Sequence, residues 1–234
     1  MSESLREPVV RVQGLTKSFI LHHQGGVELR VLEDLSFEVR AGECVALQGR
    51  SGAGKSTLLK CLYASYRPSA GSIQVGGTEV GAASPQALLR MRRETVGYVS
   101  QFLRVIPRVP TLEVVAEPLL EEAGGDPDAA AKARAEAEQL LLRLRIPMRL
   151  WSVAPATFSG GEQQRINVAR GLIPKRPVLL LDEPTASLDA DNRATVTVMI
   201  NEARAAGAAI IGIFHDRQVR EAVATRVLDL EAAT

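Results

Sequence analysis

Short, continuously hydrophobic segments alternate with amphipathic segments along most of the chain. The hydrophobic ones are typical of strands covered on both faces, as in parallel sheets. The amphipathic ones have apolar residues at helical spacing and predict helices. This alternation predicts an α/β fold with a mainly parallel core sheet. The expected strands are Cys44–Leu47, Val96–Val99, Val178–Leu181, Ala209–Ile213 and Arg226–Leu230. The expected helices are Lys55–Tyr63, Ser84–Arg93, Glu162–Leu172, Asp191–Ala206 and Asp216–Ala224.

The beginning and the middle of the chain differ from this alternation in their hydrophobic pattern and residue composition. Near the N-terminus, Val9–Phe19 and Val31–Val39 alternate between apolar and polar residues, which favours an antiparallel flank. Residues 124–146 are rich in Ala, Glu and Arg, and Asp126 followed by Pro127 is a typical helix start. We therefore expect the middle of the chain to form a helical subdomain inserted into the α/β core.

The boundaries of this insertion are set by the motifs on either side. We expect one domain over residues 1–234, with its α/β core at about 1–101 and 157–234 and its helical subdomain at about 102–156. The segment Phe102–Pro118 contains three prolines, so we expect part of it to be irregular.

Composition narrows the functional class. The chain has 234 residues, 46% hydrophobic and 24% charged, which is typical of a globular protein rather than a disordered one. The net charge of +1 predicts no nucleic-acid partner. Cys44 and Cys61 form no CxxC pair, so we expect free, buried thiols rather than a zinc site. The longest apolar run, near Ala208–Phe214, is too short to span a membrane. We expect a soluble, cytoplasmic chain without direct membrane insertion.

A phosphate-binding loop is the clearest chemical motif. GxxxxGK[ST] is matched in full between an expected strand and an expected helix, the context that the motif requires. Its glycines let backbone N–H groups surround a phosphate, and the helix N-terminus adds positive charge. Lys55 can reach the β- and γ-phosphates, and Ser56 can bind Mg²⁺. The loop residues are Gly49, Arg50, Ser51, Gly52, Ala53, Gly54, Lys55, Ser56 and Thr57.

An acidic pair follows a buried strand later in the chain. Asp182 and Glu183 come directly after the run Val178–Leu181. A metal–triphosphate complex needs an acidic group beside the phosphate loop, and we assign this role to Asp182. Hydrolysis also needs a base or a water-positioning group, for which Glu183 is the candidate. Alone, the pair could equally be a solvated acidic turn; together with the phosphate loop it favours a nucleotide-hydrolysing site.

Further motifs resemble those of a known protein family. The segment Ser159–Arg165, reading SGGEQQR, resembles the signature motif of the ATP-binding cassette (ABC) ATPases. The remaining family landmarks follow in order along almost the whole chain. They are Gln101 as the Q-loop glutamine, Ser187 and Asp189 in the D-loop, His215 as the switch histidine and Phe19 as the aromatic residue that stacks on adenine. Phe19 could instead be a core residue.

The resemblance implies a fold, cofactors and a partner. It implies an ABC nucleotide-binding domain that binds ATP and Mg²⁺, with Gln101 near the metal and the attacking water and His215 near the γ-phosphate. The signature residues would face the γ-phosphate bound by another protomer, in a head-to-tail dimer with itself or with a related cassette. These residues are Ser159, Gly160, Gly161 and Glu162. Glu162 stands where the family often has Gln.

The resemblance implies two biological roles, of which we expect the first and keep the second as the alternative. Several segments resemble an ATPase subunit of the bacterial carbon–phosphorus lyase system. That resemblance implies work with the core subunits of that system, including G, H and I, with or without the related K cassette, in forming a ribose 1-phosphonate 5-triphosphate. The segment Phe102–Val115 resembles exporter cassettes of the lipoprotein-release and macrolide type instead. A clamp that hydrolyses ATP very slowly is a third possibility, against which Glu183 argues.

Overall fold

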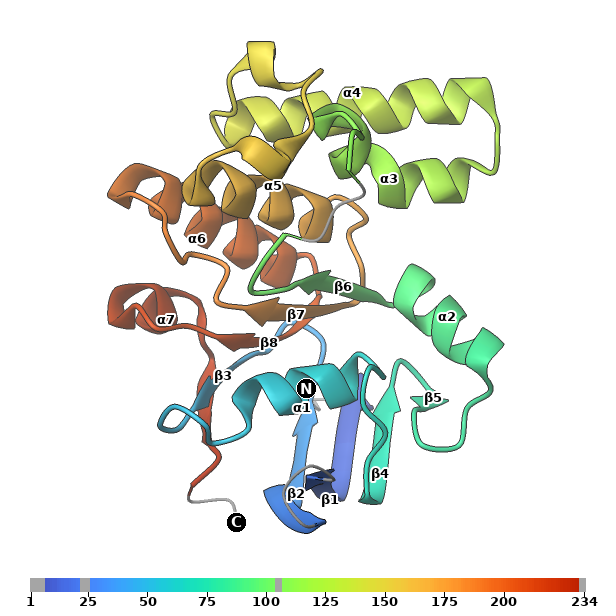
Figure 1. Ribbon diagram of the computed structural model, residues 1–234, viewed down its shortest axis with the longest axis vertical. Helices are drawn as coiled ribbons and strands as arrows, with labels where there is room; N and C mark the ends of the chain where they lie inside the picture. The colour runs from blue at the N-terminus through green and yellow to red at the C-terminus, as the bar shows by residue number, and fades with distance from the viewer. Residues whose placement is uncertain (1–6, 22–25, 104–106, 232–234) are drawn as a thin grey trace, which may run out of the picture.

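Two β-sheets form the body of the molecule, with α1 (Lys55–Leu62) between them (Figure 1). The computed structural model describes residues 7–21, 26–103 and 107–231. The parallel sheet has the order β6-β7-β8-β3-β9 and the antiparallel sheet the order β2-β1-β4-β5. This confirms the predicted α/β class. The parallel strands are β3 (Cys44–Gln48), β6 (Val96–Val99), β7 (Val178–Asp182), β8 (Ala209–Ile213) and β9 (Arg226–Asp229). The antiparallel strands are β1 (Val10–Leu21), β2 (Val27–Val39), β4 (Ala70–Val75) and β5 (Thr78–Glu79).

Strand β7 shows why the central strands are continuously hydrophobic. All five of its residues are buried. Val178 and Leu180 belong to the core that includes α1, whereas Leu179 and Leu181 belong to the core on the opposite face of the sheet. Alternate side chains of one strand therefore fill two different cores, and the parallel sheet needs apolar residues at every position.

The parallel register gathers the predicted motifs at one edge of the sheet. Asp182 pairs with Ile213, and Cys44 pairs with Ile210. The carboxyl ends of β3, β6, β7 and β8 therefore lie at the same edge, and each is followed by a predicted functional segment. Ligands of open parallel sheets bind at this edge.

Helices cover the other face of the parallel sheet in two layers (Figure 1). The two nearer ones are α5 (Gly160–Leu172) and α6 (Ala190–Ala205), and the outer pair is α3 (Thr111–Ala123) and α4 (Pro127–Arg143). Among the described residues, the other helices are α2 (Pro85–Glu94), α7 (Arg217–Val223) and two short 3₁₀ turns at Met148–Leu150 and Pro155–Thr157. The predicted start of α4 is confirmed, because the Asp126 carboxylate accepts hydrogen bonds from two N–H groups of the first turn.

The proline-rich segment is irregular in part, as predicted, because its described residues before Thr111 form no helix or strand and α3 begins only there. Helix α3 continues through Pro118, although proline cannot donate a hydrogen bond to the fourth preceding carbonyl. Val114, Val115 and Ala116 are buried in the core, and this burial offsets the lost bond. The boundary between an α/β core and a helical subdomain remains a prediction.

The sequence analysis also missed two strands. Strand β4 pairs with β1 across a long sequence separation, with Val10 opposite Val75, and β5 is a two-residue extension.

Both cysteines are free and buried, as predicted, and burial raises the pKa of Cys44 to about 12 and that of Cys61 to about 11. Among the described helices, none combines the length and the hydrophobicity needed to cross a bilayer.

Candidate active site

The phosphate loop has the backbone that its glycines predicted. Gly52 and Gly54 have φ values of 86° and 88°, in the left-handed region that favours glycine. A Cβ on Gly54 would lie 2.8 Å from the carbonyl oxygen of Val31, so this residue also needs to be small. No side chain caps the N-terminus of α1. Its first N–H groups, together with the positive end of the helix, are suited to a phosphate.

Lys55 supplies the positive charge of this loop. Its Nζ donates hydrogen bonds to the carbonyl oxygens of Gly49 at 2.7 Å and Arg50 at 2.8 Å. The ammonium group therefore lies against the first two residues of the phosphate loop, beside the N-terminus of α1. Residues 49–54 connect β3 to α1, and Lys55, Ser56 and Thr57 form the first turn of the helix, as the sequence motif predicted.

Ser56 and Asp182 form the candidate metal site. The Ser56 hydroxyl donates a hydrogen bond of 3.3 Å to Oδ1 of Asp182, although 126 residues separate them. Asp182 is buried, and this burial raises its pKa against the opposing effect of the Ser56 bond. A hydroxyl and one carboxylate are hard oxygen donors, which Mg²⁺ prefers together with water and phosphate oxygens. Among the described residues, no group of three His, Cys, Asp or Glu side chains could hold a metal ion.

Glu183 and His215 are paired next to this site. His215 Nε2 lies 2.8 Å from Glu183 Oε1, joining the end of β7 to the end of β8. Glu183 has a φ of 55°, a conformation that costs a residue with a side chain about 1–3 kcal/mol and that is common at functional sites. A pocket of about 150 Å³ opens beside the pair, lined also by Ser187 and Asp216. It can hold water next to the proposed base.

The signature segment forms the N-terminus of α5, as its glycines suggested. Ser159 caps the helix, and Glu162 completes a capping box. The Glu162 carboxylate accepts hydrogen bonds from the hydroxyl of Ser159 at 2.7 Å and from its N–H at 3.0 Å. These bonds lower the pKa of Glu162, the hydroxyl bond having the larger effect, so its negative charge is held at the helix N-terminus.

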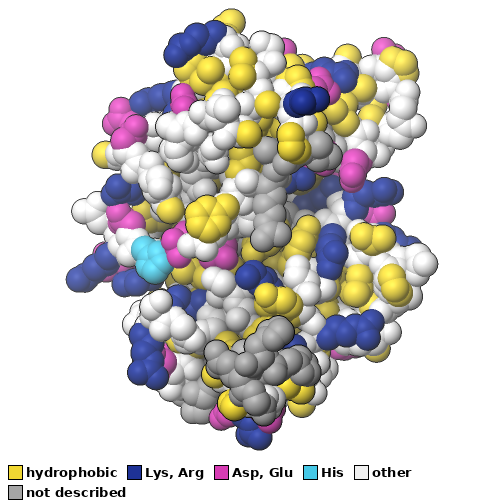
Figure 2. Space-filling view, viewed as in Figure 1, with side chains coloured by type: hydrophobic (Ala, Val, Ile, Leu, Met, Phe, Trp, Pro, Cys, Tyr) yellow, Lys and Arg dark blue, Asp and Glu magenta, His cyan; other side chains and the backbone are white. Residues whose placement is uncertain are grey.

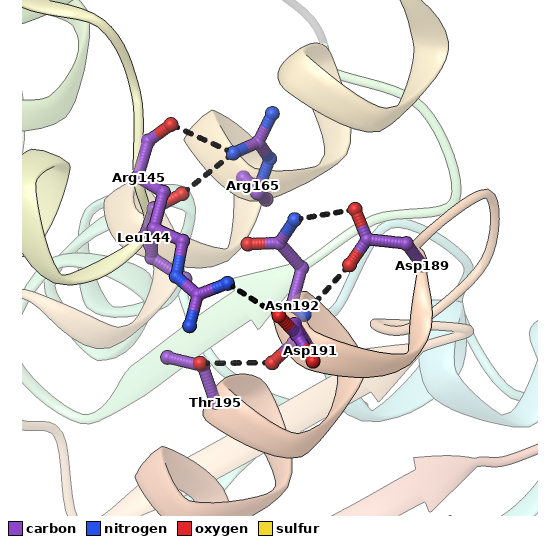
Figure 3. Close-up of polar contacts among 7 residues, drawn as sticks. All are labelled: Leu144, Arg145, Arg165, Asp189, Asp191, Asn192 and Thr195. Atoms are coloured by element: carbon purple, nitrogen blue, oxygen red, sulfur yellow. Dashed lines mark hydrogen bonds and ion pairs between the residues drawn. The ribbon is translucent and has the colours of Figure 1, made fainter.

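The D-loop packs directly on the signature segment. A Cβ on Gly161 would lie 2.9 Å from the carbonyl oxygen of Ser187, which explains why no larger residue stands there. Asp189 ends this loop and caps α6, accepting a hydrogen bond of 2.8 Å from the N–H of Asn192 (Figure 3). The hydrogen bonds from Asn192 lower the pKa of Asp189.

Phe19 and Gln101 are less closely tied to the rest of the site. Phe19 makes an edge contact with Tyr66, with ring centroids 5.2 Å apart, and Lys17 Nζ lies 4.7 Å from the centroid of its ring. Gln101 is exposed directly beyond β6, and no hydrogen bond joins it to the other described site residues. The structure thus places both residues but does not test their predicted roles.

Three residues of α5 connect the site, and the sequence analysis assigned them no role. Gln164 is buried and donates a hydrogen bond of 3.0 Å to the carbonyl oxygen of Glu183. Asn167 donates one to the carbonyl oxygen of Ser100, the residue before Gln101. Arg165 contacts the end of α4 (Figure 3). Their only signal in the sequence was their position just after the signature glycines, because the partners lie far away in the chain.

Comparisons with known proteins agree with this geometry. The family model described as "ABC transporter" matches residues 32–186. The lipoprotein-releasing system ATP-binding protein LolD of Idiomarina loihiensis is 37% identical, over 93% of this chain and 92% of that protein. The macrolide export ATP-binding/permease protein MacB of Burkholderia pseudomallei is also 37% identical over 95% of this chain, which spans only 33% of that longer protein.

Solved structures of ATP-binding cassettes have the same fold as this chain. A dimeric structure of the ATP-binding cassette MJ0796 bound to ADP and phosphate has a TM-score of 0.86 and 26% identity. The match covers 94% of this chain and 93% of that one. A phosphate loop, an acidic strand end, a signature segment and a D-loop are thus combined on the fold of known cassettes. On this sequence and structural agreement, the chain belongs to the ABC transporter family of ATP-binding cassettes.

Proposed function

We propose that this chain binds Mg·ATP and hydrolyses it. The main observation in support is that three groups of functional side chains lie at one edge of the parallel sheet. These are the Lys55 loop, the Ser56–Asp182 contact of 3.3 Å and the Glu183–His215 contact of 2.8 Å. Phosphoryl transfer needs positioning and charge stabilisation more than covalent chemistry, and these groups supply both.

Each group has a distinct task in this proposal. The N–H groups of the loop and Lys55 bind the β- and γ-phosphates. Ser56 and Asp182, joined by Gln101, hold Mg²⁺, which when bound neutralises charge on the phosphates. The Glu183 carboxylate accepts a proton from the attacking water. His215 orients that carboxylate in the structure described here, and would turn its N–H to the γ-phosphate when nucleotide is bound.

The second half of each site comes from another protomer. The exposed N-terminus of α5, at Ser159 and Gly160, offers N–H donors to an anion. We infer a head-to-tail dimer with a second copy or a related cassette, in which this end meets the partner's γ-phosphate. The dimeric MJ0796 structures support this arrangement.

Two variants separate ATP binding from hydrolysis. Lys55→Ala should abolish ATP binding, whereas Glu183→Gln should retain binding and lower turnover by about 10²–10⁴-fold, the usual contribution of a general base. Lys132→Ala, on the exposed face of α4, is the matched lysine control and should change neither. Unchanged ATP affinity in Lys55→Ala, or unchanged phosphate release in Glu183→Gln, would contradict the site assignment.

The comparisons favour an exporter as the machine that this cassette drives. LolD and MacB belong to lipoprotein release and macrolide export by name, and we propose a membrane permease as the partner. The pyoverdine export protein PvdT of Pseudomonas putida is 38% identical, similar to the other two although its named cargo differs. Identity at this level therefore supports an exporter-type motor without choosing a cargo.

Phosphonate breakdown is the second candidate. None of the relatives described above is a carbon–phosphorus lyase subunit, so this role rests on the sequence resemblance of particular segments. They are Phe19–Gln24, Leu62–Pro68, Ser100–Arg108, Leu150–Gly161 and Gly212–Asp216. Residues 22–24 and 104–106 of these segments lie outside the described structure. In this role the cassette drives a complex with the lyase core subunits, and its cytoplasmic location stays a prediction.

A hollow beside α2 is the candidate docking place for either partner. It has a volume of about 720 Å³, lies between α2, α3, α5 and β6, and is larger than the pocket beside Glu183. Figure 2 shows this face hollowed, with Lys and Arg side chains at its wall. Leu89 lines it and is 61% exposed, so its side chain is available to a partner that fills the hollow.

Affinity capture from source cells grown without phosphate distinguishes the two partners. An integral membrane permease among the captured proteins would support the exporter, whereas soluble phosphonate-pathway subunits would support the lyase complex. Leu89→Asp should lose the partner while retaining ATP hydrolysis. Val198→Asp, another exposed aliphatic residue but on α6, is the matched control and should retain both. Equal capture by both variants would contradict docking at the hollow.

A further inference from the structure

Arg165 joins three backbone carbonyls at the junction of α5 and α4. Its Nε donates to the carbonyl oxygen of Gly161 at 3.2 Å. Its Nη1 donates to the carbonyl oxygens of Leu144 at 2.8 Å and Arg145 at 2.9 Å, as Figure 3 shows. A guanidinium is planar and presents its donors at fixed angles, so these bonds fix the first turn of α5 relative to the end of α4. Lysine could not reproduce them.

The end of α4 needs these donors. Arg145 has a φ of 54°, at the position after a helix where glycine is common. The N–H of Ile146 turns back to the carbonyl of Leu141 at 2.9 Å, which closes the helix. The carbonyls of Leu144 and Arg145 then point out of the helix, and Arg165 is their partner.

A second link runs from the same turn to the D-loop helix. The Arg145 side chain contacts Asp191 at 2.9 Å, in the first turn of α6, next to the Asp189 cap (Figure 3). Gly161 also packs on Ser187, as described above. The N-terminus of α5 is therefore held by α4 through Arg165 and by the D-loop through direct packing.

We propose that Arg165 is a positioning residue that aligns the signature segment with the ATP bound by the dimer partner. This inference rests on the head-to-tail dimer of the proposed function. The hydrogen bonds of Arg165 run to carbonyls of α5 and of the end of α4, whereas Lys55 and Ser56 of the chain's own phosphate loop lie on α1. Its loss would misalign the N–H donors of α5, and misplacement by about 1 Å can cost a site about 10²-fold in rate. The loss of rate would affect the site that holds the partner's ATP, and the site that holds the chain's own ATP would keep its rate.

The first test separates binding from turnover. Arg165→Gln and Arg165→Lys should both lower the turnover number by at least about tenfold. Binding of ATP to the separate chain should stay unchanged. Arg143→Gln is the matched control. Arg143 is another arginine that joins two helices, but it joins α4 to α6, through two hydrogen bonds of 2.7 Å to Glu202, and not α4 to α5. Wild-type turnover in Arg165→Lys, or an equal loss in Arg143→Gln, would overturn the proposal. Thermal unfolding of each variant shows that the fold is retained.

Mixed dimers then show on which site Arg165 acts. A Lys55→Ala chain cannot bind ATP but carries an intact signature segment. Mixed with an Arg165→Gln chain, it should form dimers with one complete site, so the mixture should hydrolyse ATP faster than either variant alone. The reference mixture combines Lys55→Ala with Gly160→Asp, which places a negative charge in the signature segment at a position where a Cβ has room.

The two mixtures give distinguishable outcomes. If the reference mixture recovers turnover and the Arg165 mixture does not, the dimer stands and Arg165 acts on its own site, which overturns the inference. If neither recovers, the composite site formed by two copies of this chain is wrong, and the inference fails with it. Recovery in both mixtures supports the proposal.

Discussion

His215 Nε2 lies 2.8 Å from Glu183 Oε1, so the side chains at the ends of two neighbouring strands share one hydrogen bond. The histidine is 68% exposed and the glutamate only 22% exposed, which leaves the imidazole accessible from the site while the carboxylate is held. If His215 orients the base, His215→Ala should lower turnover by about 10- to 100-fold with little change in ATP affinity.

A conservative variant separates this role from a merely structural one. His215→Gln retains a hydrogen-bond donor and should recover part of the lost turnover. Steady-state phosphate release and a separate ATP-binding titration measure the two quantities. Wild-type turnover in His215→Ala would mean that the contact is an ordinary surface hydrogen bond without a role in hydrolysis.

Glu162 places a negative charge where the partner's γ-phosphate is expected. Its carboxylate accepts both the hydroxyl and the N–H of Ser159, and its lowered pKa keeps it ionised at neutral pH. Glu162→Gln preserves the capping box but removes the charge. A charge at a helix N-terminus is worth about 0.3–1 kcal/mol, so the KM for ATP should fall by about two- to fivefold.

The control for this effect is a glutamate away from the site. Glu138→Gln, exposed on α4, should leave the KM for ATP unchanged. The difference between Glu162→Gln and wild type should also shrink as salt concentration rises, because salt screens exposed charges. A higher KM in Glu162→Gln would show that the cap matters more than the charge.

Asp182 links the metal site to the stability of the fold. Burial raises its pKa, so the native state holds the proton more tightly than the unfolded chain does. Its favourable contribution is present below the ordinary pKa of aspartate and is lost as pH rises through the native pKa. Asp182→Asn should therefore raise Tm at pH 7 and leave it unchanged near pH 3, while abolishing Mg²⁺-dependent hydrolysis. Each kcal/mol gained would raise Tm by about 2–4 °C.

Thermal unfolding at the two pH values checks this expectation. Asp128→Asn, exposed on α4, is the matched control and should show no such gain at pH 7. A lower Tm for Asp182→Asn at pH 7 would mean that the Ser56 hydrogen bond outweighs the cost of burying the carboxylate.

The motifs that could be predicted from the sequence are those whose chemistry is continuous along the chain. The phosphate loop needs its residues in one turn, so Gly54 and Lys55 were found directly. The acidic strand end at Asp182 was found because β7 is uniformly apolar before it. The Gln164 and Arg165 contacts could not be predicted, since their acceptors lie 19 and 21 residues away and are backbone carbonyls of any residue type. Which part of Phe102–Pro118 is irregular could not be predicted either, because Pro118 lies inside α3, where burial of the helix outweighs the low helix propensity of proline.

Phe19 and Tyr66 define the last prediction, on recognition of the base. Their rings meet edge to face at 79°, and Lys17 lies over the Phe19 ring. If Phe19 stacks on adenine, Tyr66 holds it in orientation, and such an aromatic contact is worth about 0.5–1.5 kcal/mol. Phe19→Ala and Tyr66→Ala should each weaken ATP binding by about two- to tenfold. Tyr66→Phe, which keeps the ring, should bind ATP as wild type does.

Inorganic tripolyphosphate distinguishes the base contact from the phosphate contacts. It carries the phosphates of ATP without adenine, so all three variants should bind it as wild type does, whereas Lys55→Ala should not bind it. Isothermal titration with both ligands measures the difference directly. An equal loss of tripolyphosphate and ATP affinity in Phe19→Ala would mean that Phe19 supports the fold around the phosphate loop, as a core residue would, and does not contact the base.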